Sequence, residues 1–132
     1  MSYAALAPNG LLVNLKIGQP TLITLDEISH FAAADKYGEI HLRDGKVVLI
    51  HYAITRIAEA FADQFIMIKR DTVVRRSEIL DYRRVKDTAN ILAVMTGGRE
   101  FAMSRRHARE VRKMLQARMM AKHSWTSKEH TL

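Results

Sequence analysis

Apolar residues recur at every second position in several stretches of the chain. Residues 11–17 follow this period, which is typical of a half-buried strand. Residues 21–25 form a second short stretch rich in β-branched side chains. Between residues 37 and 52, two alternating runs flank Asp44-Gly45, a dipeptide favoured in two-residue hairpin turns. The period therefore predicts antiparallel β-structure in the first part of the chain.

The turn dipeptide also predicts a register for the hairpin between residues 37 and 52. With a two-residue turn at Asp44-Gly45, Leu42 lies opposite Val47 and one side of the hairpin is apolar. The returning strand, residues 46–52, has apolar residues on its other side as well. We therefore expect burial on both faces of that strand.

Helical periodicity appears in two places. In residues 53–63, one face of a short helix would hold the apolar positions Ile54, Ile57, Ala58 and Phe61. Ser104 is a good N-cap residue, and it precedes a second helix with one apolar face formed by Ala108, Val111, Leu115 and Met119. Strand-like stretches lie between the two helices, and Gly97-Gly98 marks a further hairpin turn.

Together these elements predict a mainly β, antiparallel multi-sheet domain with one short inserted helix and a carboxy-terminal helix. At least eight short strands are expected. Residues 1–11 are predicted to be an N-terminal arm, residues 12–120 the domain, and residues 121–132 a flexible tail. No adjacent pair of helices is joined by a tight turn, which argues against DNA recognition by a helix-turn-helix.

The composition is that of one intracellular domain. A chain of 132 residues has room for a single core. It contains no cysteine, which excludes disulfides and thiolate metal sites and fits a reducing cytosol. The longest apolar runs are far shorter than the roughly 20 residues of a membrane helix, and no secretion signal is seen. We therefore expect a soluble, cytoplasmic protein with no membrane association.

The positive charge is concentrated in two segments. The formal net charge is +7. Residues 65–86 hold seven Lys or Arg against three acidic residues, and residues 104–118 hold six against one, so these segments account for all of the excess. Clustered positive charge can attract a polyanion, whereas evenly spread charge argues only for solubility.

Two short motifs give the chain a family resemblance. Residues 65–74, FIMIKRDTVV, are similar to a Phe-x-x-x-His-Arg/Lys-Ser-hydrophobic-Val-Asn pattern, and Met103-Ser104-Arg105-Arg106 to Val-Ser-Arg-Arg before a last helix. With their order around the inserted helix, they resemble the LytTR-type DNA-binding domain found at the carboxy end of many bacterial response regulators. The likeness covers residues 12–118. The chain departs from the pattern at Lys69, Asp71 and Arg75, which stand where the family has His, Ser and Asn.

The resemblance implies an elongated fold of about ten strands in stacked sheets, from which loops reach bases in successive major grooves. Residues 35–38 would form the first loop, Lys69 and Arg70 the second, and Arg105 with Arg106 the third. The chain is too short to include a receiver domain, so the resemblance suggests a stand-alone module or an isolated piece. It also suggests a homodimer on repeated half-sites.

Candidate roles follow from side-chain chemistry. Base-reading candidates are Arg70, Arg105 and Tyr37. An arginine fork can donate two hydrogen bonds to guanine, which is worth about 1–3 kcal/mol of discrimination. Phosphate candidates are Lys36, Lys69, Arg75, Arg76, Ser104, Arg106 and Arg109. Simpler roles remain open: either arginine could pair with a carboxylate such as Asp71, and Ser104 could be a plain N-cap.

Other chemistries find no support in the sequence. The predicted register puts His41 and His51 on opposite faces of the hairpin, and no metal-ligand spacing or carboxylate cluster joins them. There is neither a nucleophile elbow nor a glycine-rich phosphate loop. We therefore expect no catalytic activity, metal, cofactor or small-molecule substrate.

The leading hypothesis is a sequence-specific regulator of transcription that binds double-stranded DNA through loops of a β scaffold. Two alternatives stay open. One is a protein-interaction module that meets an acidic partner. The other is a binder of RNA or single strands, which the scarcity of interleaved exposed aromatic residues disfavours.

Overall fold

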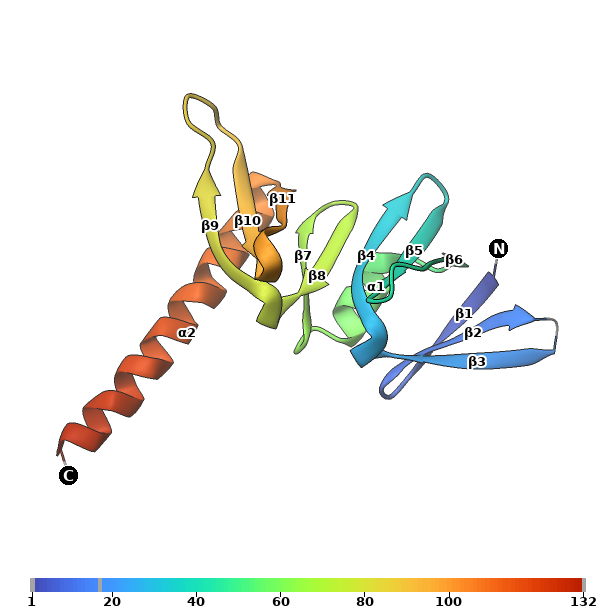
Figure 1. Cartoon of the computed structure of the whole chain (residues 1–132), viewed down its shortest axis with the longest axis horizontal. Helices are drawn as coiled ribbons and strands as arrows, with labels where there is room; N and C mark the ends of the chain where they lie inside the picture. Colours follow the sequence, from blue (N-terminus) through green and yellow to red (C-terminus); the bar gives the residue numbers. More distant parts are fainter. Residues whose placement is uncertain (1, 17, 132) are drawn as a thin grey trace. The chain divides into compact units, whose positions relative to one another are not determined.

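The protein was analysed as a computed structural model that describes the backbone of residues 2–16 and 18–131 and the side-chain surroundings of residues 2–15 and 18–121. The chain divides into two compact units, residues 1–77 and 78–132. Figure 1 shows the elements of both. The first unit contains β1 (Ser2–Ala7), β2 (Gly10–Lys16), β3 (Gln19–Thr24), β4 (Ile28–Ala34), β5 (Tyr37–Leu42), β6 (Val47–His51), α1 (Ile54–Ala60), β7 (Phe65–Lys69) and β8 (Thr72–Arg75). The second contains β9 (Ile79–Arg84), β10 (Ile91–Met95), β11 (Glu100–Met103) and α2 (Arg105–Thr131).

The strands of the first unit form one sheet in the order β3-β2-β1-β6-β5-β4-β8-β7. All neighbours pair antiparallel except β1 and β6, which are parallel. The strands of the second unit form a separate sheet in the order β11-β10-β9. With the two α-helices, this confirms the prediction of a mainly β fold.

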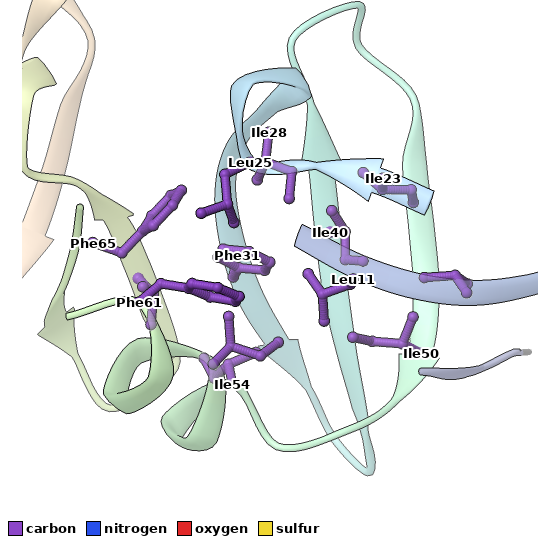
Figure 2. Packing of buried hydrophobic residues seen from close by; sticks show 13 residues of the cluster. Leu11, Ile23, Leu25, Ile28, Phe31, Ile40, Ile50, Ile54, Phe61 and Phe65 are labelled. Carbon is purple, nitrogen blue, oxygen red and sulfur yellow. The ribbon is translucent and has the colours of Figure 1, made fainter. Parts of the chain in front are cut away.

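One face of the first sheet packs on α1. Ile54, Ile57 and Phe61 are buried, as the helical period predicts, and Figure 2 shows the side chains of Ile54 and Phe61 among those of the sheet. Phe31 of β4 meets Phe65 of β7 edge to face, with ring centroids 5.3 Å apart. This core fixes β4, β7 and β8 against the helix.

The first strand was not predicted. Residues 2–7 form β1, which pairs with β2 on one side and with β6 on the other. The expectation of an N-terminal arm over residues 1–11 is wrong for this segment. Its sequence, SYAALA, has apolar residues, mostly alanine, on both faces and therefore shows no period of two.

The register of the β5–β6 hairpin differs by one residue from the prediction. Ile40 pairs with Val48, and His41 with Val47. The Leu42 N–H donates to the Lys46 carbonyl (2.8 Å), so the turn contains three residues rather than two. Gly45 takes the left-handed conformation (φ 94°) that such a turn requires. The shift leaves Val47 exposed, so burial on both faces of β6 is also a wrong prediction.

In the second unit, α2 packs on the three-stranded sheet. Ala108 and Val111 of the helix are buried with Ile79, Ala93 and Met103 of the sheet. Met119, which the helical period places on the same face, is 62% exposed. Residues 121–131, which were predicted to be a flexible tail, belong to the helix in their backbone, and side chains from 122 onward lie outside the described part. In the described part of the chain, no helix has the length and apolarity needed to cross a membrane.

Candidate nucleic-acid interface

Two hairpin turns of the first unit lie side by side at one end of its sheet. Ala34 pairs with Tyr37, which leaves Asp35 and Lys36 as the β4–β5 turn. Lys69 pairs with Thr72, which leaves Arg70 and Asp71 as the β7–β8 turn.

Strands β4 and β8 run antiparallel as neighbours, so the end of one meets the start of the other. The Ala33 N–H donates to the Asp71 carbonyl (2.9 Å) and joins the end of β4 to the β7–β8 turn. Both turns are at the same end of these strands in Figure 1.

The basic side chains of these turns point into solvent. Lys36, Lys69 and Arg70 are exposed, and among the described residues none of them has a carboxylate within ion-pair distance. The Asp71 carboxylate instead accepts the Thr72 hydroxyl (3.1 Å). The alternative in which Asp71 neutralises Arg70 is therefore absent from this structure.

A second basic group lies on the first two turns of α2. Arg105, Arg106 and Arg109 are exposed. The first turn of this helix holds no acidic residue. The second unit therefore also presents cations that described carboxylates leave unpaired.

Comparison with known proteins connects this arrangement to a family. The model of the LytTr DNA-binding domain matches residues 19–116 of this chain, which include both hairpin turns and the start of α2. The chain belongs to the LytTr DNA-binding domain family. The resemblance inferred from the two motifs is confirmed, and the family is defined by DNA binding rather than by catalysis.

A solved structure shows the same fold. The LytTr DNA-binding domain of a protein described as a methyl-accepting/DNA response regulator from Bacillus cereus superposes with a TM-score of 0.59 at 18% sequence identity, covering 86% of this chain and 95% of that one. A search of curated proteins finds no match.

In this LytTr domain, Tyr37 is half-buried at the base of the first turn. Its ring meets that of His51 edge to face, with centroids 5.6 Å apart. On the other side of His51, the ring of Tyr3 stacks at 4.9 Å, and Tyr3 is 74% exposed. The sequence did not predict this contact of Tyr3 and Tyr37 with His51, because β1 gave no strand signal and the pairing of β1 with β6 is long-range.

Arg75, which was predicted to contact phosphate, lies in the core. It is 7% exposed. Its Nη2 donates to the carbonyl oxygens of Leu25 and of Ile28, the latter at 2.8 Å. The guanidinium carbon lies 4.8 Å from the centroid of the Phe65 ring. A side chain held in this way cannot reach DNA, so Arg75 is withdrawn from the phosphate candidates.

Arg76 also serves the fold. Its Nε donates to the Ala62 carbonyl (2.7 Å), and its backbone N–H donates to the Gln64 carbonyl (2.8 Å). These bonds hold the end of β8 to the segment that follows α1. We therefore withdraw Arg76 as well.

Ser104 acts as the cap of α2. Its Oγ accepts the His107 N–H (3.2 Å) and lies 2.5 Å from His107 Nδ1. Partial burial lowers the pKa of His107, and the charge of Arg106 lowers it further. A neutral His107 fits its contact with the serine hydroxyl. The geometry is that of the plain N-cap, so Ser104 is not retained as a phosphate ligand.

The histidines are arranged differently from the prediction. His41 and His51 share a face of the sheet, because the register of β5 and β6 is shifted by one residue. His41 stacks on His30 with ring centroids 4.2 Å apart and approaches Glu39 Oε1 at 3.0 Å. Within the described residues, no three His, Asp or Glu side chains gather as a metal site would require.

Proposed function

We propose that this protein is a sequence-specific regulator of transcription that binds double-stranded DNA through turns of its β scaffold. The observation that supports the proposal most is the paired turns of the first unit. They hold Lys36, Lys69 and Arg70 at one end of a rigid sheet, exposed and without a described carboxylate partner. The match to residues 19–116 shows that the chain belongs to the LytTr DNA-binding domain family. This membership supports DNA as the ligand of the two basic turns.

The roles divide by chemistry. Arg70 and Arg105 read bases, because a guanidinium can donate two parallel hydrogen bonds to guanine O6 and N7. Lys36, Lys69, Arg106 and Arg109 neutralise phosphates, which positions the protein without specifying sequence. Tyr37 contributes its hydroxyl at the base of the first turn. The protein acts in the cytoplasm, where a bacterial chromosome lies, as a homodimer on repeated half-sites.

A selection experiment tests the proposal. The protein is incubated with a library of randomised duplexes, bound molecules are sequenced, and the best duplex is compared with a scrambled one by fluorescence anisotropy. We expect a discrete sequence motif. Arg70→Gln and Arg105→Gln should each reduce the preference for the selected duplex by about 5- to 150-fold, the equivalent of roughly 1–3 kcal/mol.

Control variants separate base reading from simple loss of charge. Lys69→Gln should weaken both duplexes alike. Lys46→Gln removes the same charge from the β5–β6 turn, and this residue is exposed and lies 4.0 Å from Asp44. It should leave both affinities within twofold of the unsubstituted protein. If all four variants lose affinity equally on both duplexes, base reading is contradicted. If single strands compete for the protein more strongly than duplex does, the protein is a single-strand binder. If an acidic polypeptide competes and no duplex binds at low salt, the DNA proposal fails.

A further inference from the structure

Two consecutive arginines of β9 have opposite surroundings. Arg83 pairs with Glu100 of β11, with its Nε 2.5 Å from Oε2 and its Nη2 3.2 Å from Oε1. This contact raises the pKa of Arg83 and lowers that of Glu100. Both side chains lie on the sheet face that turns away from α2. Arg83 is therefore engaged within the sheet.

Arg84 points to the other face, because side chains alternate along a strand. There it lines a pocket of about 290 Å³ between the end of the sheet and the first turns of α2. The lining residues are Arg84, Ala89, Ile91, Arg105, Ala108, Arg109 and Arg112. All of them belong to the second unit.

Four arginines and no acidic residue line the pocket. Arg84, Arg105 and Arg109 have no ion-pair partner among the described residues, and Arg112 lies over the Tyr82 ring at 5.4 Å from its centroid. The acidic residue nearest in sequence on α2, Glu110, is 3.7 Å from Lys113. Four like charges around one hollow repel one another, and a bound anion would offset that repulsion.

We propose that this pocket is a binding site for a phosphate group, in which Arg84 and Arg112 act together with Arg109, while Arg105 lines the pocket and keeps its proposed role at a base. Guanidinium groups suit this ligand, because their planar forks match the oxygens of a phosphate. The small side chains of Ala89 and Ala108 leave the hollow open. Ser104 caps the His107 N–H at the start of the helix, and the proposed ligands are the arginine side chains of the pocket.

The source of the phosphate is the backbone of DNA, and this part of the inference rests on the proposed function. Arg84 and Arg112 then enlarge the contact surface of the second unit beyond the residues that the motifs indicated. A free phosphate anion has the same chemistry and is the other source that the experiment must separate.

The first measurement compares Arg84→Gln with Arg83→Gln, a matched variant on the same strand that removes the same charge from the opposite face. Duplex affinity is measured by anisotropy at several salt concentrations. Each phosphate neutralised contributes about 0.9 to the slope of log affinity against log salt. Arg84→Gln should therefore lower the slope by about 0.9 and reduce affinity about eightfold at 0.1 M salt, whereas Arg83→Gln should change neither.

The second measurement uses inorganic phosphate and the isotope-labelled protein without DNA. We expect saturable shifts of the Ala89, Ile91 and Ala108 amide signals, which Arg84→Gln abolishes and Arg83→Gln preserves. If the phosphate titration saturates but Arg84→Gln and Arg83→Gln have the same duplex affinity, the site binds a free anion and not DNA. If Arg84→Gln weakens duplex binding and Arg83→Gln does not, but the phosphate titration does not saturate, the site binds the phosphate of DNA.

If the two variants behave alike on duplex and phosphate produces no saturable shift, the pocket is not a phosphate site. If the unsubstituted protein binds no duplex at low salt, the proposed function fails, while the phosphate titration still decides the pocket.

Discussion

Replacement of the buried Arg75 by methionine should destabilise the first unit strongly and leave the DNA contacts of the folded protein intact. Methionine is of similar length and fills the space of the arginine stem, but it donates no hydrogen bond. The carbonyl oxygens of Leu25 and Ile28, which Arg75 satisfies, would lose that donor in the interior.

The size of the effect follows from these contacts. An unsatisfied buried carbonyl costs about 1–3 kcal/mol, and loss of the interaction with the Phe65 ring costs about 0.5–2 kcal/mol. Removal of a buried charge returns part of this, because the desolvation of the guanidinium is no longer required. We expect a net loss of about 2–4 kcal/mol, which is a large part of the 5–15 kcal/mol that typically holds a domain folded.

Urea unfolding followed by far-ultraviolet circular dichroism measures the loss. Amide hydrogen exchange at residues 23–31 then shows whether it lies around the strand and turn that Arg75 holds. Lys69→Met is the matched control: it removes an exposed cation from the same hairpin and should stay within about 0.5 kcal/mol of the unsubstituted protein. Arg75→Lys should fall between the two, because one ammonium retains the charge but not the planar geometry. If Arg75→Met is as stable as Lys69→Met but loses duplex affinity, Arg75 contacts DNA and the structural argument is refuted.

Two further predictions concern the sheet and pH. Gly38→Ala would place a Cβ 2.7 Å from the Tyr52 carbonyl oxygen, which is backbone and cannot move aside cheaply, so we expect a loss of about 1–3 kcal/mol in urea unfolding. Burial and Arg106 lower the pKa of His107 in the folded protein, so the unfolded chain binds more protons between the ordinary histidine pKa of 6.5 and the lower folded value. Stability should therefore fall as pH drops through this window, and His107→Gln should flatten that slope in melting curves recorded at several pH values; an unchanged slope would contradict the assignment.

The sequence predicted those elements whose periods are local. The helix at residues 54–60 and the pairing of β10 with β11 across Gly97-Gly98 follow from spacing and turn residues alone. The β5–β6 register did not, because Asp44-Gly45 fits both a two-residue and a three-residue turn, and only the left-handed Gly45 in the folded hairpin decides between them. Strand β1 was not predicted because apolar side chains, mostly alanine, occur on both of its faces and give no contrast between them.

The sequence predicted the exposed basic residues of the candidate site, but not the burial of Arg75 or the pocket that Arg84 lines. The motifs indicated Lys69, Arg70 and Arg105, which the structure leaves exposed. For Arg75 a usable signal existed: it follows the buried Val73 by two positions, so strand alternation puts it on the core face. That signal was not used because Arg75 is followed by Arg76, and the pair was interpreted as part of a basic surface. No local pattern could indicate Arg84, since its pocket exists only where the end of β9 meets α2.

The pairing of β4 with β8 determines when, during folding, the two basic turns come together. The two strands are about forty residues apart in the chain, and β5, β6, α1 and β7 lie between them. Contacts between such distant segments form late and slow the folding of β proteins, because a large loop must close first. A nascent chain that ends before β8 would have the first turn but not its neighbour. The ability to hold a duplex should therefore arise in one step near the end of folding, when β8 docks.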